Sequence, residues 1–453
     1  MKVYSNILDM VGETPMLEVT NIDTGMCRLF LKLELMNPGG SIKDRIGVSM
    51  IEQAEKRGDI KPGDTLVEAT AGNTGLGLAL VAARKGYKLI LVLPDKMSQE
   101  KIFNLSAMGA EIVLTRSDVG RGHPEYYQDL GKTIAKKKNA YFINQFGNFD
   151  NPLAHEKGTA PEILNQMNGD LDAIVLGVGS SGTVSGISKY LKEHAPNVEM
   201  ILADPEGSVL TDWINKGELN AGGSWLVEGI GEDFIPDIAN FEKVTKAYSI
   251  SDDESFQVAR NLLRKEGILA GSSSGTCLAA ALKYCREQTE PKKVVTFACD
   301  TGNKYLSKLF NNFWMEDHGF IRRKKFGDLR DFIGRLHSEG ATSTVGPTDT
   351  LTTAHNRLRN SGYSQLPVLN DGQLLGMITE KTIINFAIDR PELMLSAVDE
   401  AMELTFPKLD KKDSFNDLKE RLSEQSYTVI LDGNKFLGLI TRSDLMNFLR
   451  KKI

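Results

Sequence analysis

The sequence lacks the features that mark membrane-spanning, secreted and metal-binding proteins. No apolar run among its 453 residues approaches the roughly 20 residues of a membrane helix, and the N-terminal segment does not read as a signal peptide. Four cysteines, Cys27, Cys277, Cys285 and Cys299, include no C-x-x-C pair and are too sparse for a disulfide framework. No histidine has a partner at metal-binding spacing, so no metal is expected. These absences predict a cytoplasmic protein.

Charge of one sign is not in large excess either. The 54 Lys and Arg residues against 60 Asp and Glu residues give a net charge of −6, which argues against a nucleic-acid partner. Hydrophobic residues make up 41% and charged residues 25% of the chain, as in globular domains, which excludes disordered and coiled-coil classes. At roughly 100–200 residues per domain, the length predicts about three domains.

Short, branched apolar runs alternate with helical stretches between Gly12 and Thr301. The clearest runs are Lys88–Leu93, Glu111–Thr115, Ala173–Leu176, Met200–Ala203 and Lys293–Ala298. Helix-like segments such as Gly75–Lys85 and Ser98–Met108 lie between them. Fully apolar strands separated by helices are typical of parallel sheets covered on both faces. We therefore predict an α/β fold with two subdomains on parallel sheets and a cleft between them.

The C-terminal part contains an internal repeat. Residues 367–387 and 429–449 share seven identities in 21 positions at an offset of 62 residues. Each copy reads as a strand, a turn, a second strand that begins at the shared glycine (Gly376 or Gly438), and a helix. A repeat of this size predicts two similar small α+β units packed against each other. The aromatic and basic segment before them reads as a linker with a linking helix.

The first of four glycine-containing motifs spans residues 37–45, N-P-G-G-S-I-K-D-R. Its Gly-Gly-Ser turn leads into a helix predicted over Ile42–Arg57, with Lys43 in the first turn. The positive end of a helix dipole, helped by burial, lowers the pKa of such an amine and makes it a better nucleophile. An ordinary surface lysine is the alternative that this motif leaves open.

The second and third motifs each follow a predicted strand. Residues 70–77, T-A-G-N-T-G-L-G, present amides and hydroxyls that suit a carboxylate or phosphate, although a ligand-free connection is the alternative. Residues 177–186, G-V-G-S-S-G-T-V-S-G, satisfy the dinucleotide pattern G-x-G-x-x-G, and Asp204 ends the next strand. A single phosphate monoester is an equally good ligand, held by the hydroxyls of Ser180, Ser181 and Thr183.

The fourth motif, residues 269–276, L-A-G-S-S-S-G-T, precedes a helix predicted over Cys277–Arg286. Its serines either serve turn and capping roles or place one hydroxyl against a heteroatom of a ring-shaped ligand. The stretch 144–155 supplies amides near the predicted cleft, and glycines in 228–234 permit close backbone approach to a ligand. For His155 we predict a structural or solvent role.

Together, the four motifs resemble the fold-type II pyridoxal-phosphate (PLP) β-family, in the order and spacing of cystathionine β-synthases and cysteine synthases. The similarity covers about residues 4–310, and the repeated tail, about residues 336–451, resembles a tandem pair of regulatory CBS domains (a Bateman module). The resemblance implies a catalytic core at 1–310, a linker at 311–335, and CBS domains at 336–394 and 395–453.

The resemblance implies roles residue by residue. Lys43 would bind the cofactor covalently and then move the substrate proton, and Asn73 would bond the cofactor's 3′-oxygen. Ser273 would face the pyridine nitrogen, where a neutral hydroxyl favours β-elimination and replacement over transamination. The cofactor phosphate would be bound by Gly179, Ser180, Ser181, Gly182 and Thr183. The amino-acid carboxylate would be held by Thr70, Ala71, Asn73, Thr74 and Gln145, and the second substrate would be lined by Gly229 and Gly231.

Some positions depart from the family pattern. Ala71 stands where much of the family has serine, and Glu232 stands where animal cystathionine β-synthases have tyrosine, a change that bears on the preferred leaving group. In the tail, Thr441 and Asp444 match a pattern that holds an adenosyl ribose, whereas the first copy has Thr382 in place of the aspartate. One nucleoside site, for S-adenosylmethionine or an adenine nucleotide, is therefore expected; Ser364, where some S-adenosylmethionine-regulated members carry aspartate, weighs against that ligand.

The implied activity is that of a PLP-dependent lyase, which condenses L-serine or O-acetylserine with L-homocysteine to give L-cystathionine and releases hydrogen sulfide from cysteine as a side reaction. The resemblance implies a homodimer, the family's usual minimum, and the lack of a long apolar run predicts no membrane attachment. Haem is not expected, because the catalytic motifs lie close to the start of the chain. Three alternatives remain open: a cysteine synthase using O-acetylserine and sulfide, an NAD-dependent oxidoreductase using residues 177–182 with Asp204, and a nucleotide sensor with an inactive core.

Overall fold

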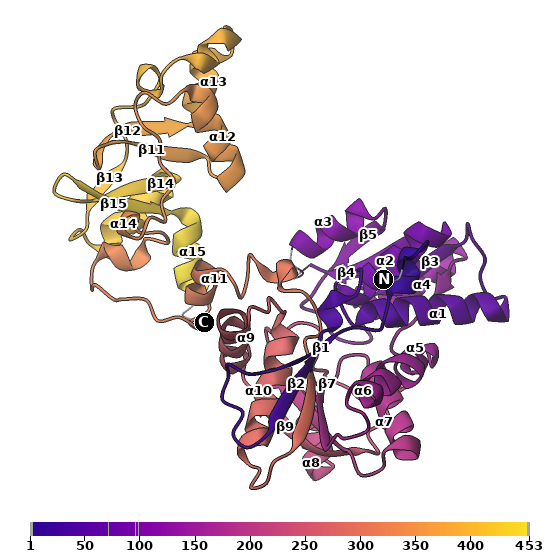
Figure 1. Ribbon diagram of the computed structural model, residues 1–453. Coiled ribbons are helices and arrows are strands. Elements are labelled where there is room, and N and C mark those ends of the chain that lie inside the picture. Colours follow the sequence, from indigo (N-terminus) through magenta and orange to yellow (C-terminus); the bar gives the residue numbers. More distant parts are fainter. Residues whose placement is uncertain (1–2, 71, 96, 98, 451–453) are drawn as a thin grey trace. The chain divides into compact units, whose positions relative to one another are not determined.

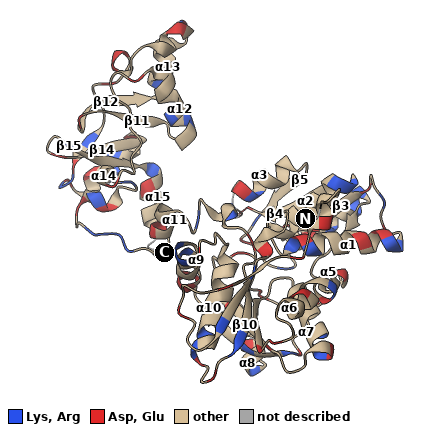
Figure 2. Cartoon of the chain, viewed as in Figure 1, with Lys and Arg blue, Asp and Glu red and all other residues tan. Residues whose placement is uncertain are grey.

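The computed structural model describes residues 3–70, 72–95, 97 and 99–450 (Figure 1). The chain divides into two units, Met1–Asn311 and Asn312–Ile453, each with its own sheets and hydrophobic core. Positive and negative side chains are interspersed along surface helices such as α1 (Lys43–Arg57) (Figure 2). Within the described ranges, none of the helices combines the length and apolar character needed to span a bilayer.

A six-stranded sheet forms one half of the N-terminal unit. Its strands, in spatial order, are β1 (Met16–Glu18), β2 (Arg28–Lys32), β10 (Lys293–Phe297), β7 (Ala173–Gly177), β8 (Glu199–Pro205) and β9 (Val244–Ile250). Only the edge pair β1–β2 is antiparallel. Val175 and Ile201 pack toward α10 (Ser272–Arg286), whereas Ile174 and Met200 pack toward α7 (Gly182–His194) on the opposite face. Both faces of the sheet are therefore covered.

A smaller parallel sheet forms the other half, with the order β5 (Glu111–Thr115), β4 (Lys88–Pro94), β3 (Thr65–Ala69) and β6 (Tyr141–Phe142). Helices α1, α2 (Asn73–Lys85) and α3 (Gln99–Ala107) share a core with one face, and α4 (Tyr127–Lys138) packs on the other. The predicted α/β fold with two subdomains on parallel sheets is confirmed. The predicted runs all lie in strands, although α10 begins at Ser272, so the three serines form its first turn.

Three short helical segments connect the halves and run beneath the start of α7. These are α5 (Asp150–Ala154), the π-helical turn His155–Thr159 and α6 (Ala160–Gln166). Gly186 of α7 packs closely against them, since a Cβ there would lie 2.2 Å from the carbonyl oxygen of Pro152. This close packing fixes the position of the loop that leads into α7 relative to these three segments.

In the C-terminal unit the two repeats build one five-stranded sheet. Its order is β11 (Gln365–Asn370), β12 (Gln373–Thr379), β15 (Lys435–Thr441), β14 (Tyr427–Asp432) and β13 (Lys408–Asp410). Helices α12 (Leu351–Ser361) and α13 (Glu380–Ala387) belong to the first repeat, and α14 (Phe415–Glu424) and α15 (Arg442–Arg450) to the second. The linker contains one short helix, α11 (Asn312–Asp317).

One prediction for the repeats is wrong. The second strand of each copy does not begin at the shared glycine but before it, so Gly376 and Gly438 lie inside β12 and β15. The glycine is needed there for close approach, because a Cβ on Gly376 would lie 2.7 Å from the carbonyl oxygen of Glu403. Each facing strand also carries a register irregularity beside this position.

Candidate active site

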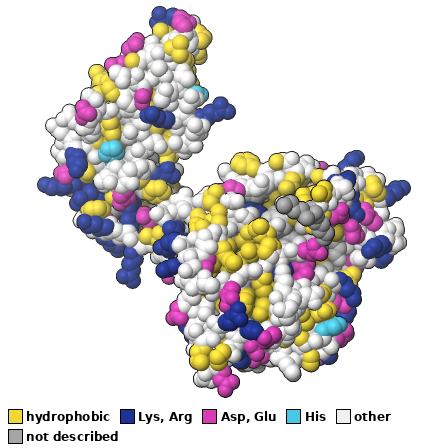
Figure 3. All heavy atoms as spheres, viewed as in Figure 1, with side chains coloured by type: hydrophobic (Ala, Val, Ile, Leu, Met, Phe, Trp, Pro, Cys, Tyr) yellow, Lys and Arg dark blue, Asp and Glu magenta, His cyan; other side chains and the backbone are white. Residues whose placement is uncertain are grey.

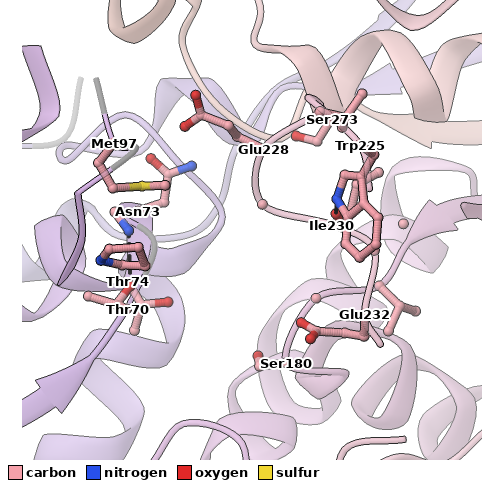
Figure 4. A pocket seen from close by; sticks show the side chains of 18 of the residues that line it. Thr70, Asn73, Thr74, Met97, Ser180, Trp225, Glu228, Ile230, Glu232 and Ser273 are labelled. Atoms are coloured by element: carbon pink, nitrogen blue, oxygen red, sulfur yellow. Dashed lines mark hydrogen bonds between the residues drawn. The ribbon is translucent and has the colours of Figure 1, made fainter. Parts of the chain in front are cut away.

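A cavity of about 540 Å³ lies between the two subdomains of the N-terminal unit. Figure 4 shows Thr70, Asn73 and Thr74 on one side of it and Ser180, Ile230, Glu232 and Ser273 on the other. Twelve predicted site residues line this cavity, namely Lys43, Thr70, Asn73, Thr74, Gln145, Gly179, Ser180, Ser181, Thr183, Gly229, Gly231 and Ser273. Gly182 lies just beneath it, and Ala71 falls outside the described residues.

Lys43 is the first residue of α1, and its backbone N–H donates to Ser41 Oγ at 3.2 Å. Helix α2 comes unusually close to this turn, because a Cβ on Gly77 would lie 2.6 Å from the Lys43 carbonyl oxygen. Burial lowers the pKa of the Lys43 amine more than the nearby acidic groups raise it. A lysine with a lowered pKa is neutral more often, which suits a nucleophile and a base.

The loop from residue 179 to 183 forms a cradle for an anion. Gly179 and Gly182 have no room for a side chain, since a Cβ would lie 2.6 Å from the Gly229 carbonyl oxygen in the first case and 1.8 Å from Asn151 Oδ1 in the second. Ser181 adopts a left-handed backbone conformation (φ 67°), and its buried Oγ has no hydrogen-bond partner among the described residues. Because an unsatisfied buried hydroxyl is costly, this atom fits a bound phosphate oxygen.

The three serines of the fourth motif have different surroundings. The Ser272 hydroxyl accepts the Glu228 N–H at 3.0 Å, and the Ser274 hydroxyl accepts the Cys299 N–H at 2.8 Å. Both hydroxyls therefore hold the backbone of the cavity wall together. Ser273, between them, lines the cavity, so it is the serine placed to meet a ligand.

The loop after β3 is braced by side chains from a neighbouring segment. The Thr74 hydroxyl donates to Gln145 Oε1 at 2.7 Å, and Gln145 Nε2 donates to the Ala69 carbonyl oxygen at 3.2 Å. Glu68, in β3 below them, accepts the Gln145 N–H, and burial raises the pKa of Glu68 to about 8. Thr74 and Gln145 thus hold polar groups in fixed positions at the cavity, as recognition of a carboxylate requires.

Asn73 is held at both ends of its amide. Its Nδ2 donates to Asp300 Oδ2 at 2.7 Å, and its Oδ1 accepts from Lys304 Nζ at 2.9 Å. Tyr305 also donates to Asp300 Oδ2 at 2.7 Å. Tyr305 also takes a hydrogen bond from Asn73, so a ligand oxygen in the cavity would compete with the Tyr305 hydroxyl for the second hydrogen of the amide nitrogen.

Several residues at the site carry no recognisable sequence signal. Lys101 in α3 pairs with Glu228 at 2.5 Å across the cleft, and Lys308 pairs with the other oxygen of Glu228 at 2.6 Å. Asn151 and His155 are fully buried beneath the phosphate cradle. These groups meet only through tertiary contacts between distant segments, although the amide-rich stretch 144–155 pointed to this part of the chain.

The dinucleotide alternative is excluded by the position of Asp204. This side chain is fully buried away from the cavity, and its Oδ2 accepts both the backbone N–H and the hydroxyl of Thr211 at 2.9 Å. It caps the start of α8 (Leu210–Lys216) and has no access to a ribose beside the cradle.

Comparison with known proteins bears out the predicted family. The pyridoxal-phosphate dependent enzyme family matches residues 7–300, and the CBS domain family matches residues 340–389 and 398–451. The chain is 36% identical to the cystathionine beta-synthase of Dictyostelium discoideum over 99% of its own length and 93% of that protein. The chain belongs to the cystathionine β-synthase family.

Solved structures of similar proteins agree with this family assignment. The chain resembles the O-acetylserine dependent cystathionine beta-synthase of Helicobacter pylori with a TM-score of 0.62 and 39% identity, over 68% of this chain and 99% of that one. A hydrogen sulfide-producing enzyme of Fusobacterium nucleatum gives the same TM-score of 0.62 and 39% identity, over 67% of this chain and all of the other. As a cystathionine β-synthase family member, the protein is a PLP-dependent lyase, and the glycine cradle and the orphaned Ser181 hydroxyl fit the phosphate of that cofactor.

In the tail, the two residues predicted to hold a nucleoside bond to each other. Asp444 Oδ2 accepts the backbone N–H of Thr441 at 2.7 Å and its hydroxyl at 2.6 Å. The backbone of Gly334 lies directly over this carboxylate, because a Cβ there would lie 2.3 Å from Asp444 Oδ1. A cavity of about 570 Å³ lies between the two repeats, lined by Thr379 and Lys381 of the first and by Arg421 and Tyr427 of the second.

Proposed function

We propose that the protein catalyses a β-replacement in which L-serine or O-acetylserine combines with L-homocysteine to give L-cystathionine. The observation that carries the proposal is the convergence, in one cavity, of Lys43, a hydroxyl-rich glycine cradle, a braced carboxylate loop and Ser273. The similarity to the Dictyostelium enzyme over 99% of this chain supports it.

Different residues of the cavity would bind different parts of the cofactor. Lys43 would bind it covalently, Asn73 would donate to its 3′-oxygen, and Ser273 would face its ring nitrogen. The backbone amides of Gly179 and Gly182 and the hydroxyls of Ser180, Ser181 and Thr183 would hold its phosphate. When bound, the cofactor supplies delocalisation of the negative charge left at the substrate Cα.

The protein's own groups position the substrate and move its proton. Thr70, Thr74 and Gln145 hold the α-carboxylate, which aims the Cα–H bond at Lys43. Lys43 Nζ removes the Cα proton and later returns it to Cα after the homocysteine sulfur has bonded to Cβ. Such positioning lowers a barrier by roughly 7–11 kcal/mol at best.

Glu232 is suited to help the leaving group. Its side chain points into the cavity (Figure 4), and burial raises its pKa well above the ordinary value. A protonated carboxyl can donate to the β-hydroxyl of serine as the C–O bond breaks, whereas acetate leaves O-acetylserine without a proton. Glu232 therefore supports the use of serine.

Initial rates with homocysteine and each donor test this proposal. We expect cystathionine from the wild-type protein, and we expect Glu232→Gln to lower the rate with serine by roughly tenfold or more while that with O-acetylserine changes little. Glu218→Gln, at an exposed position outside the cavity lining, is the matched control. Cysteine formed from O-acetylserine and sulfide, with no cystathionine from either donor, would favour the cysteine synthase alternative.

A side reaction of the same cavity releases hydrogen sulfide. Cysteine carries a thiol at Cβ where serine carries a hydroxyl, so the Lys43 step that eliminates one can eliminate the other. Similarity to the hydrogen sulfide-producing enzyme of Fusobacterium nucleatum supports this side reaction.

We also propose a cytoplasmic homodimer that uses no haem and binds one adenosyl ligand in its tail at Thr441 and Asp444. The four free cysteines suit a reducing compartment.

Apolar side chains gather in patches on the viewed face (Figure 3). Large exposed apolar side chains in the N-terminal unit include Met36, Phe103 and Phe149. Such patches are typical of subunit interfaces. Light scattering of the purified protein tests the dimer. A haem absorbance band in the pure protein would contradict the proposal that it uses no haem.

A further inference from the structure

We infer that Asn151 and His155 are positioning residues of the phosphate cradle, which direct the hydroxyl hydrogens of Ser180 and Thr183 into the cavity. The inference deepens the proposed function and rests on it, because it requires a phosphate bound at residues 179–183.

The two side chains project from one helical face onto the underside of the cradle. They are four residues apart, so they lie on the same side of the segment. Asn151 is 1% and His155 0% exposed. Gly182 of the cradle and Gly186 of α7 make room for both, because a Cβ on Gly182 would meet Asn151 Oδ1 and a Cβ on Gly186 would lie 2.8 Å from His155 Cβ. The cradle thus rests directly on these two residues.

Asn151 fixes the direction of the Ser180 hydroxyl. Asn151 Nδ2 donates to Ser180 Oγ at 3.0 Å and to the Gln145 carbonyl oxygen at 2.8 Å. The opposite amide orientation would set Asn151 Oδ1 against the Gln145 carbonyl oxygen, and two acceptors repel. Since an amide nitrogen only donates, Ser180 is the acceptor in this bond, and its single hydrogen is left for the cavity.

His155 acts in the same way on Thr183. Its Nε2 lies 3.3 Å from Thr183 Oγ1, and its Nδ1 lies 2.9 Å from Thr159 Oγ1. Burial, with the nearby Lys43 and Arg45 charges, keeps the pKa of His155 well below its ordinary value, so the ring is neutral and carries one hydrogen. We assign the tautomer in which Thr159 donates to Nδ1, so that Nε2–H donates to Thr183 and the Thr183 hydrogen also faces the cavity.

The result is a cradle in which every hydroxyl is a donor. Ser180 and Thr183 have their acceptor positions occupied from below, and the Ser181 hydroxyl has no partner in the part of the chain that the structure describes. A phosphate dianion is acceptor-only, so it binds most strongly to groups that present hydrogens. Asn151 also donates to the Gln145 carbonyl oxygen, and so connects the cradle to the residue that braces the loop after β3.

Equilibrium binding of PLP and of pyridoxal, which lacks the phosphate, tests the inference without a turnover assay. Asn151→Asp replaces the donor with an acceptor that takes the Ser180 hydrogen and adds a negative charge. We expect PLP affinity to fall by roughly ten- to a hundredfold, as for loss of a bond to a charged group, while pyridoxal affinity changes less than about threefold. In a Ser180→Ala background, the same substitution is expected to cost several-fold less.

His155 offers a paired test. His155→Leu removes the donor to Thr183 and is expected to weaken PLP binding and to shift the ³¹P resonance of bound PLP. His155→Gln restores an N–H donor and is expected to recover PLP affinity to within about threefold of wild type. This pair decides the question even if circular dichroism shows that Asn151→Asp fails to fold.

Failure of the inference and failure of the proposed function look different. Equal wild-type affinities for PLP and pyridoxal would contradict phosphate binding in the cradle and with it the proposed function. A strong wild-type preference for PLP that Asn151→Asp retains, or that His155→Leu and His155→Gln alter equally, would overturn the positioning role alone.

Discussion

Lys43 and Glu68 are buried groups on which the chemistry and rigidity of the cavity depend. Burial lowers the pKa of the lysine and raises the pKa of the glutamate to about 8, so burial favours the neutral form of each group. Neutrality makes Lys43 a base, and it lets Glu68 sit beneath the carboxylate loop without repelling an anionic substrate.

Lys43→Ala tests the assignment of the reactive lysine. We expect turnover to fall by roughly a thousandfold or more, because both covalent attachment and proton transfer are lost, while the fold and reversible cofactor binding persist. Visible absorbance and steady-state rates measure the two effects. Lys56→Ala, at an exposed position of the same helix, is the matched control. Retention of near-wild-type turnover in Lys43→Ala would contradict the assignment.

Glu68→Gln tests the raised pKa of the buried glutamate. Between its ordinary value of 4.5 and about 8, the folded protein holds a proton at Glu68 that the unfolded chain releases. Stability therefore falls as pH rises through this window, whereas the glutamine variant escapes the penalty, which is at most about 5 kcal/mol. Urea unfolding should show the variant gaining on wild type between pH 5 and pH 8.5. A difference independent of pH would contradict the raised pKa.

At the scale of elements, α3 and the glycine loop of residues 223–233 meet across the cleft through one ion pair. The Lys101 stem packs against Gly72, where a Cβ would lie 2.7 Å from Lys101 Cδ, and its ammonium reaches Glu228. Burial and two lysines act on this carboxylate, and the lysines dominate, so the pKa of Glu228 is lowered. The pair thus connects the carboxylate loop to the loop that lines the second substrate.

Lys101→Met tests this connection. We expect a loss of about 2–4 kcal/mol in the free energy of unfolding, since a buried charge loses a partner, together with a lower kcat/KM for the donor amino acid. Glu228→Gln and the double variant complete a double-mutant cycle measured by urea unfolding. Strictly additive losses would show that the two side chains do not interact.

Sequence predicted the elements better than the contacts between them. Branched apolar runs such as Lys88–Leu93 were located to within one residue, because burial on both faces of the strand requires them. The start of α10 was placed too late, since Ser and Gly are typical of turns and only Gly271 and the packed cavity wall show where the helix begins. His155 was read as structural or solvent-facing, and its contact with Thr183 spans 28 residues that no local pattern links.

At the scale of the whole molecule, the motifs predicted family and cofactor, because four glycine loops in one order are specific where each alone is not. Lys101 and Glu228 are 127 residues apart, and their pairing depends on the packing of the two subdomains. No spacing in the sequence indicates such a pair. In the tail, the sequence pointed to Thr441 and Asp444 but not to the Gly334 backbone that covers them.

The nucleoside proposal is tested by thermal unfolding with adenosyl compounds. A ligand at about a hundred times its Kd should stabilise the wild-type tail by about 2.7 kcal/mol, and Asp444→Ala should remove this gain. Thr382→Ala, at the equivalent position of the first repeat, is the control expected to keep it. An unchanged gain in Asp444→Ala would place the ligand elsewhere, with the cavity at Thr379 and Arg421 as the next position to examine.

The most direct test of the account is product analysis by mass spectrometry after the PLP-loaded protein meets homocysteine and serine in D₂O. The account predicts cystathionine with deuterium at Cα of the serine-derived half, because the proton that Lys43 removes exchanges with D₂O at Nζ before Lys43 delivers a deuteron to Cα. It predicts no cystathionine with Lys43→Ala. Absence of cystathionine from both serine and O-acetylserine, with the cofactor bound, would contradict it.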